Sequence, residues 1–323
     1  MNIVGKDYTV IDVYDLSVTV PDSFVVNDNK TCDGHGEAKL YMGSKNHMRD
    51  FYTGDTQNEG FSYKCFILKK DMIRYMQTIR HEYLHPSIKY RGQGDKKNMN
   101  HLWTKRYNDI QQLPNILTFD VKDQNQIRGD RGYVKVSSNP TKGGYGLIRS
   151  VALPFVSYIS VMKLQDDLTG DIVFYWKLFT DFTRMAEQQY AAKNYGKKKD
   201  IKSKRTRDGQ EKYRQNLFEQ FLHCPFTQID DVKLLVASHI KPWSVCNKAE
   251  KTDINNGLML SPLFDKLFDR GYITFKDNGD LIISDWLSPA NQQRVNFTYN
   301  KEDLHLTDKR KAFLEYHRNN VFK

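Results

Sequence analysis

The chain of 323 residues has no apolar run close to the ~20 residues that a membrane-spanning helix needs. Its first residues, MNIVGKDYTVIDVYD, lack the basic start and the apolar centre of a secretory signal. These two absences exclude the usual signatures of membrane and secreted proteins, and we expect a cytoplasmic protein.

Cysteine is also scarce. The four cysteines, Cys32, Cys65, Cys224 and Cys246, are far apart, and none belongs to a Cys-x-x-Cys pair. This spacing supports neither a zinc knuckle nor a disulfide framework. Reduced thiols in a cytoplasmic protein are the simpler interpretation.

Acidic residues are fewer than basic ones, 39 against 49, which gives a net charge of +10. An excess of positive charge favours a polyanionic partner, and nucleic acid is the first candidate. The segment KNYGKKKDIKSKRTR, residues 193–207, holds eight Lys and Arg residues and a single acid, Asp200. It is either a solvated basic linker or a segment that contacts phosphates.

The sequence pattern changes at this basic linker. Before it, β-rich runs such as YTVIDVYDLSVTV (8–20) alternate with helical periodicity, as at DMIRYMQTIRHEYL (71–84). After it, the order is helix, strand, long polar loop, strand, helix, hairpin and helix. We therefore predict an α+β protein with a mixed, β-rich α/β domain over residues 1–195 and a second domain over residues 196–323.

Glycine-rich basic loops are expected inside the first domain, at residues 89–97 and 139–146. Such loops could reach a groove of DNA, although flexible surface loops are the simpler interpretation. By default we assign recognition of a DNA target, or regulation, to this domain.

The second domain places polar residues around two strands and a helix. His239 lies at the end of the strand in LLVASHI, and Asn256 precedes the strand GLML. The helix SPLFDKLFDRG carries Asp265 and Asp269, which are four positions apart and therefore share one helix face. Two carboxylates on one face suit Mg²⁺, a hard cation that needs only one or two of them besides water and phosphate.

Each of these residues also has a simpler structural interpretation. His239 could be a core histidine with a hydrogen-bond partner, and Asp265 a surface acid paired with a basic neighbour. Asp269, beside Arg270, could be a capping or ion-pair residue. The combined spacing favours the functional interpretation for His239 and Asp265, and it leaves Asp269 open.

The second domain resembles the HNH endonuclease family, in its restriction-endonuclease-like branch. Six blocks stand in the family's order over roughly residues 205–323: GQEKYR, CPFT, LLVASHIKPW, NNGLMLSPLFDKLFDRGYITF, DNGDLIIS and AFLEYHRNNVF. The resemblance implies a ββα-metal nuclease fold and metal-dependent hydrolysis of DNA phosphodiester bonds. It also implies a restriction-type or phage-defence role.

The resemblance implies a role for each residue. His239 matches the general base that activates water, and Asn256 matches the residue that ties down the loop. Asp265 matches the metal ligand on the helix, and Asp269 matches a further ligand that some members carry. Many members have a metal-binding Asp or His where this chain has Ser238, so the set of ligands departs from the family pattern here.

We expect Mg²⁺ as the cofactor, with Mn²⁺ or another divalent cation as alternatives. The expected substrate is double-stranded DNA. One core of this type cuts one strand at a time, so double-strand cleavage needs a homodimer or two successive cuts. The candidate DNA contacts are basic residues near the site and in the linker: Lys241, Lys266, Arg270, Lys204, Arg205 and Arg207.

Two other functions compete with this prediction. The pentapeptide HEYLH matches a zinc-peptidase motif, in which His81 and His85 bind zinc and Glu82 is the general base. Pro86 follows at once and no completing motif lies downstream, so we interpret the match as accidental. The nearer alternative is a DNA-binding protein with a degenerate, inactive core, which Ser238 favours.

Overall fold

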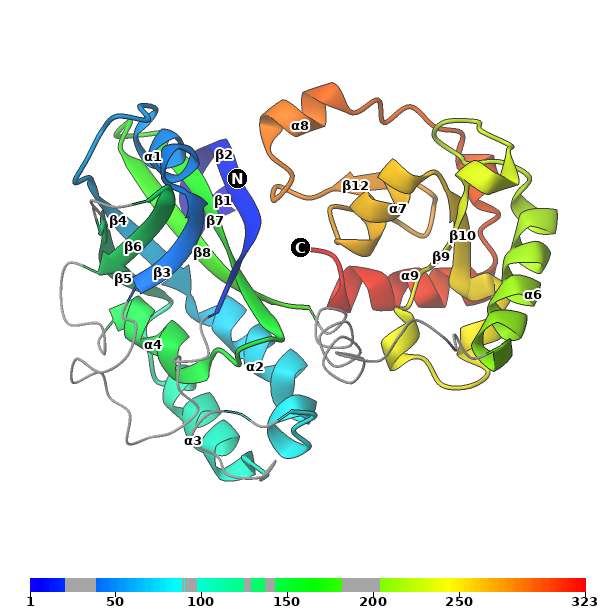
Figure 1. Cartoon of the computed structure of the whole chain (residues 1–323), viewed down its shortest axis with the longest axis horizontal. Coiled ribbons are helices and arrows are strands. Elements are labelled where there is room, and N and C mark those ends of the chain that lie inside the picture. The colour runs from blue at the N-terminus through cyan, green and yellow to red at the C-terminus, as the bar shows by residue number, and fades with distance from the viewer. Residues whose placement is uncertain (21–38, 89, 91–97, 125–128, 137–142, 182–203) are drawn as a thin grey trace. The chain divides into compact units, whose positions relative to one another are not determined.

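The computed structural model describes residues 1–20, 39–88, 90, 98–124, 129–136, 143–181 and 204–323 (Figure 1). The chain divides into two compact units, Met1–Ala191 and Ala192–Lys323. Within these ranges, no helix is long and apolar enough to cross a membrane. The architecture is α+β, with helices and a mixed sheet in the first unit and short strands between helices in the second.

The first unit contains one eight-stranded sheet with the strand order β1-β2-β7-β8-β4-β5-β6-β3. All neighbouring strands are antiparallel except β4 and β8, which are parallel. The strands are β1 (Asn2–Ile3), β2 (Lys6–Thr19), β3 (Lys39–Ser44), β4 (Ser62–Leu68), β5 (Ile116–Asp123), β6 (Arg131–Val136), β7 (Ser157–Asp166) and β8 (Ile172–Thr180).

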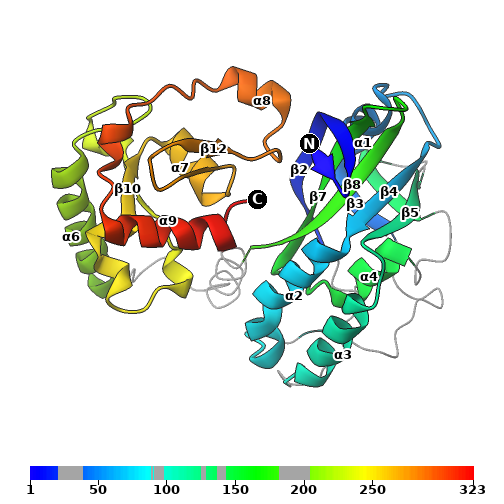
Figure 2. The same ribbon diagram turned by 180° about the vertical axis from the view of Figure 1, so that it is seen from behind.

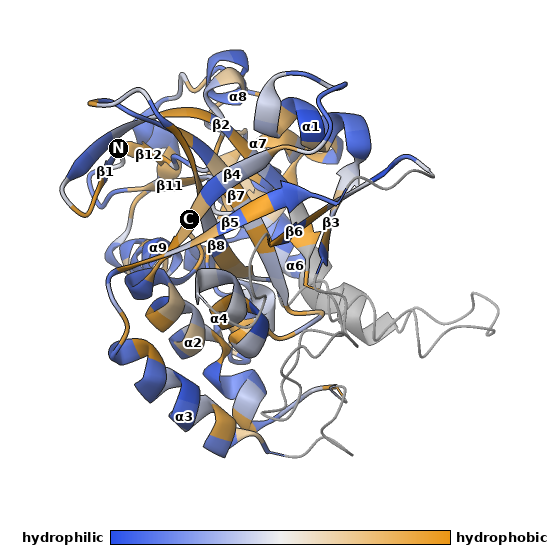
Figure 3. Ribbon diagram, turned by 90° about the vertical axis from the view of Figure 1, so that its left-hand side faces the viewer, coloured by the Kyte–Doolittle hydropathy of each residue, from blue (hydrophilic) through white to orange (hydrophobic). Residues whose placement is uncertain are grey.

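Alternation along the strands builds the core of this unit. In β8 the side chains of Phe174, Trp176 and Leu178 are buried in one hydrophobic cluster, as expected for every second residue of a strand. The helices add their apolar faces to the same cluster. They are α1 (Lys45–Thr53), α2 (Lys69–Leu84), α3 (Asn100–Gln111) and α4 (Gly143–Val151). In Figure 3, α2 and α3 carry hydrophilic and hydrophobic residues in alternating bands, as helices on a core do.

The expected loop at residues 139–146 is wrong in its second half, because α4 begins at Gly143. A Cβ at Gly144 would lie 2.8 Å from Cδ1 of Phe119 and 3.0 Å from the carbonyl oxygen of Leu117. Glycine therefore lets this helix approach β5 closely, which a composition rule for loops does not anticipate. Residues 139–142 and most of the loop at 89–97 lie outside the described residues.

The HEYLH segment has a structural role. Glu82 is buried, and its carboxylate accepts hydrogen bonds of 2.8 Å from the backbone N–H of Ser87 and from the hydroxyl of Tyr90. Helix α2 ends one residue before His85. No group of three or more His, Cys, Asp or Glu side chains that could hold a metal occurs among the described residues. The geometry therefore gives no support to a zinc peptidase.

The second unit contains two pairs of short strands and four α-helices within residues 204–323. Its strands are β9 (Val236–His239), β10 (Gly257–Leu260), β11 (Ile273–Phe275) and β12 (Leu281–Ile283), and its helices are α6 (Lys204–Phe221), α7 (Pro262–Asp269), α8 (Pro289–Arg294) and α9 (Asp308–Asn320). Strands β9 and β10 are antiparallel, as are β11 and β12. Helix α6 lies beside β9 and β10 in both views (Figures 1 and 2).

Helix α7 begins and ends where its residues predict. Ser261 is the N-cap residue and Pro262 occupies the first helical position, where its missing N–H costs no hydrogen bond. After the helix, Gly271 has a φ of 68°. Phe264 and Phe268 point into the core of this unit, and Asp265 and Asp269, each one position further along, share the neighbouring face of the helix.

The core of the second unit contains a buried histidine, His317 of α9. Its Nδ1 lies 3.0 Å from the hydroxyl of Thr274, its Nε2 lies 3.1 Å from the carbonyl oxygen of Phe268, and its ring stacks on the Phe268 ring. Burial lowers the pKa of His317 to about 3.

We predict that this histidine makes the free energy of unfolding depend on pH. The pKa is lower in the folded chain than the usual 6.5, so the unfolded chain takes up the proton first as pH falls. Stability is therefore complete above pH 6.5 and falls below it, by at most ~1.4 kcal/mol per pH unit. Urea unfolding of the wild type and of His317→Gln between pH 6.5 and the folded pKa of about 3 measures how the free energy of unfolding changes with pH. An equal pH dependence in both proteins would contradict the prediction.

Candidate active site in the second unit

Three neighbours fix the imidazole of His239 at the end of β9. The ring stacks on Tyr213 of α6, with centroids 4.5 Å apart and planes 21° apart. It meets the ring of Trp243 edge-on, with centroids 5.4 Å apart. Its Nε2 lies 3.1 Å from the carbonyl oxygen of Lys251. The ring is thus held on one face, at one edge and at one nitrogen.

The contact with Lys251 determines which nitrogen of His239 can take a proton. A carbonyl oxygen only accepts hydrogen bonds, so Nε2 carries the proton in the neutral ring and Nδ1 keeps its lone pair. Burial lowers the pKa of His239 from its usual value, and the hydrogen bond to Lys251 partly opposes this. The ring is therefore neutral at neutral pH, with Nδ1 available as a general base.

Asn256 closes the loop that joins β9 to β10. Its fully buried amide accepts a hydrogen bond of 2.7 Å from the backbone N–H of Lys241, at the start of the loop. It donates to the carbonyl oxygen of Glu250 at 3.1 Å and to Sγ of Cys246 at 3.2 Å. The amide bonds to Lys241, Cys246 and Glu250 and forms no hydrogen bond with His239, so Asn256 acts on the imidazole only through the loop. It keeps the loop, and with it the carbonyl of Lys251, in place.

Lys241 forms an ion pair within this loop. Its Nζ lies 2.8 Å from both carboxylate oxygens of Glu250, and both side chains are mostly buried. The pairing raises the pKa of Lys241 and lowers the pKa of Glu250. The sequence indicated a phosphate contact for Lys241, whereas its charge is already matched by an acid of the same loop.

Two carboxylates lie on α7 beside the helix face that packs into the core, and Asp265 is partly buried. Burial raises the pKa of Asp265, and the nearby Ser238 hydroxyl and Lys266 oppose the rise. Burial and then the charge of Asp265 raise the pKa of Asp269 to about 6, although this residue keeps an exposed surface. The spacing of four therefore brings the carboxylates close enough to repel each other.

Ser238 lies beside Asp265, opposite Leu258 in the strand ladder. The residue is buried, and its Oγ forms no hydrogen bond among the described residues apart from the contact that lowers the pKa of Asp265. This hydroxyl, the Asp265 carboxylate and the Asp269 carboxylate that Asp265 repels are oxygen donors of the kind that a hard divalent cation takes. Water and phosphate would have to supply the other ligands. Oxygen donors favour Mg²⁺ or Mn²⁺ over zinc.

The remaining candidate contacts are less well defined. Lys266 is exposed on α7, and Arg270 is the C-cap residue of the same helix. Lys204, Arg205 and Arg207 belong to the first two turns of α6, where the structure describes the backbone and not the side chains.

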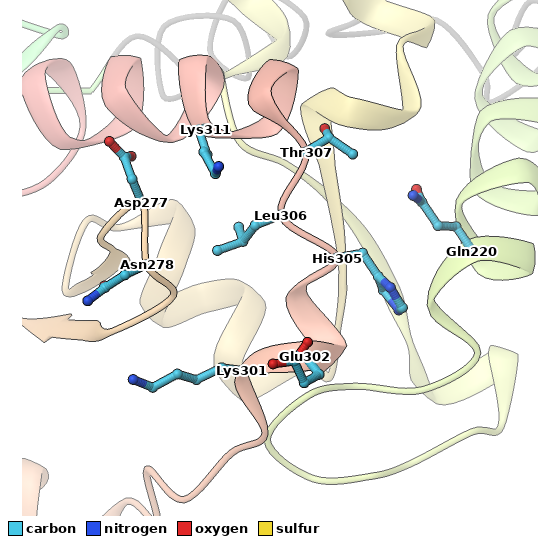
Figure 4. Close-up of a pocket in the computed structure, with 9 residues that line it drawn as sticks. All are labelled: Gln220, Asp277, Asn278, Lys301, Glu302, His305, Leu306, Thr307 and Lys311. Atoms are coloured by element: carbon cyan, nitrogen blue, oxygen red, sulfur yellow. The ribbon is translucent and has the colours of Figure 1, made fainter.

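An open pocket with a volume of about 590 Å³ lies elsewhere in this unit (Figure 4). Its walls come from α6, the β11–β12 hairpin, a 3-10 turn at Lys301–Leu304 and the start of α9, and none of the candidate residues lines it. The lining residues are Gln220, Asp277, Asn278, Lys301, Glu302, His305, Leu306, Thr307 and Lys311. The pocket is therefore separate from the candidate active site.

Three residues that support the candidate site are not apparent from the sequence. Tyr213 stands in the GQEKYR block without a signal of its own, and the contribution of Lys251 is a backbone carbonyl that no side-chain pattern reveals. Glu250 stands alone in a polar loop, so nothing in the sequence links it to Lys241.

We predict that Asn256→Ala lowers the free energy of unfolding by about 1–3 kcal/mol, because it leaves the buried N–H of Lys241 without a partner. Its neighbour Asn255 is partly exposed and bonds instead to Thr307, which makes Asn255→Ala a matched control with a smaller effect. Urea unfolding measures both. An equal loss in the two variants would show that the loop does not depend on Asn256.

Comparison with known families covers part of this unit. Residues 224–276 match the family model described as HNH endonuclease. The matched segment contains β9, β10 and α7, and with them Ser238, His239, Asn256, Asp265 and Asp269. No family model matches the first unit, and no curated protein matches the chain.

Proposed function

We propose that the chain is a metal-dependent DNA endonuclease. The match of residues 224–276 to the HNH endonuclease family model supports the proposal. The observation that carries the proposal is the fixed, neutral imidazole of His239, whose Nδ1 is free to take a proton. His239 ends the strand β9, which pairs with β10 and packs against α7. Base and carboxylates come from adjacent elements of one ββα unit.

The proposed reaction is hydrolysis of a phosphodiester bond. Nδ1 of His239 takes a proton from water, and the hydroxide oxygen bonds to phosphorus as the bond to the leaving oxygen breaks. When bound, a divalent cation neutralises the charge that develops on the phosphate and on the leaving oxygen. Asp265 and Asp269 would hold that cation, with the neutral hydroxyl of Ser238 as a third oxygen.

We predict that His239→Ala lowers the rate of plasmid cleavage with Mg²⁺ or Mn²⁺ by at least about 10²-fold, because the general base is lost. DNA affinity should stay close to that of the wild type. His223→Ala is the matched control, since this histidine of the same unit is paired with Asp303 at 3.0 Å, outside the candidate site. Equal cleavage by the wild type and His239→Ala would refute the mechanism.

We predict that the affinity for Mg²⁺ falls as the pH drops below about 6, the pKa that burial and Asp265 give to Asp269. The cation needs the ionised carboxylate, so affinity is full above this pH and is lost below it, by up to about tenfold per pH unit. Calorimetric titration with Mg²⁺ on either side of this pH tests the prediction. Asp269→Asn should move the pH dependence to the lower pH at which Asp265 takes up a proton, whereas Asp285→Asn, at an exposed position, should leave it unchanged.

One observation favours the alternative of a DNA-binding protein with an inactive core. Ser238 supplies a neutral hydroxyl where a metal-binding Asp or His is common in the family, so the cation would have a weaker ligand at this position. If neither the wild type nor His239→Ala cleaves DNA with Mg²⁺ or Mn²⁺ while both bind it, the inactive core is the correct interpretation.

We further propose a restriction-type or phage-defence role, in which residues 1–195 recognise the DNA target or regulate cleavage. The size of this separate unit and the net charge of +10 on the whole chain support the proposal. Cleavage of modified and unmodified DNAs, followed by sequencing of the ends, distinguishes sequence from modification as the recognised feature. The stagger of the ends also shows whether the two strands are cut together, as in a homodimer, or one at a time.

A further inference from the structure

We propose that Tyr213 is a positioning residue for the general base, and that it holds the His239 ring through both its own ring and its hydroxyl. The inference rests on the proposed nuclease function. Tyr213 belongs to α6, before the segment that matches the HNH model begins at residue 224. The base of the site would therefore depend on a helix outside that segment.

The first support is the pair of contacts that Tyr213 makes. Its side chain is buried, with 3% exposed, and its ring covers one face of the imidazole of His239. Its hydroxyl donates a hydrogen bond of 3.0 Å to the carbonyl oxygen of Asn256. The same carbonyl accepts from the backbone N–H of Ile240, the residue after the base. The hydroxyl thus fixes the tyrosine to the strand pair that carries His239.

The second support is the glycine opposite the base. Gly257 faces His239 in the β9–β10 ladder. Its φ of −152° is that of extended backbone, which any residue adopts, so its conformation does not require glycine. Space does, because a Cβ at this position would overlap the Tyr213 hydroxyl and lie 2.9 Å from Cδ2 of Leu217. Glycine at position 257, opposite His239, therefore leaves the space that the Tyr213 hydroxyl occupies.

Holding the ring matters because a histidine ring rotates about its last side-chain bond. That torsion has broad wells, and a turn of half a circle puts Cδ2 in the place of Nδ1 and Cε1 in the place of Nε2, which breaks the contact of Nε2 with Lys251. Stacking on Tyr213 and the edge contact with Trp243 restrict the tilt of the ring, while the carbonyl of Lys251 selects Nε2 as the donor. Without the tyrosine ring, one face of the imidazole loses its support.

The experiment separates the ring from the hydroxyl. Tyr213→Phe keeps the stacking, and Tyr213→Leu removes it but keeps an apolar side chain in the core. We expect kcat for DNA cleavage to fall by about 10²-fold in the leucine variant, with KM for DNA little changed, because a misplaced catalytic group loses about this factor. In the phenylalanine variant kcat should fall by less than about tenfold.

Phe221→Leu is the control for lost packing. Phe221 is a buried aromatic residue of the same helix whose ring contacts are with His305 and Arg310. This variant should lose stability and keep its kcat. Gly257→Ala should lower kcat through its clash with the hydroxyl, and adding Tyr213→Phe should recover part of it. Equal losses of kcat in Tyr213→Leu and Phe221→Leu would overturn the proposal.

A readout without cleavage separates this inference from the nuclease function. The ¹⁵N shifts of the His239 ring nitrogens, measured at a mildly alkaline pH where the ring is neutral, report which nitrogen carries the proton. We expect the Nε2–H form in the wild type and in Tyr213→Phe, and a mixture of forms in Tyr213→Leu. An unchanged tautomer in the leucine variant would overturn the proposal. Absence of cleavage by the wild type would instead refute the nuclease function.

Discussion

The buried amide of Asn256 is the interaction on which the candidate site depends. An amide without exposure to water must find hydrogen-bond partners inside the protein, and this one finds them at both ends of the β9–β10 loop. Once the loop is closed, Glu250 can reach Lys241 and the carbonyl of Lys251 can reach His239. A polar loop with little regular structure thereby becomes a rigid support for one imidazole.

The two carboxylates of the candidate site repel each other. Asp265 and Asp269 are placed where each disfavours the charge of the other, so the ionised pair is costly without a cation. Ser238 adds an oxygen without adding charge. The repulsion that a cation would relieve therefore comes from the two carboxylates alone. A third acid in place of Ser238 would increase both this repulsion and the attraction for a cation.

Local pattern was enough to predict the residues that are close in sequence. The ends of α7 follow from Ser261, Pro262 and Gly271, and the shared face of Asp265 and Asp269 follows from a spacing of four. The α+β class and the HNH endonuclease resemblance of the second domain are confirmed. The assignments of His239 as base and of the carboxylates as ligands stay predictions.

The residues that the sequence did not reveal act over longer separations. Tyr213 reaches His239 from another helix, and Lys241 meets its acid only because the loop folds back. In the first unit, the parallel contact of β4 with β8 joins strands that are more than a hundred residues apart. Propensity and periodicity carry no information on such pairings, because packing of the whole unit determines them.

The stacking of Tyr213 on His239 also bears on how the second unit could be divided or transplanted. Residues 224–276 alone contain Asp265 and Asp269, Asn256 and His239, which suggests that this segment could be transferred by itself. Without α6, however, the imidazole of His239 would lose the ring that covers one of its faces, and Gly257 would lose its contacts with Tyr213 and Leu217. The smallest transferable module therefore starts at α6, before the segment that matches the family model.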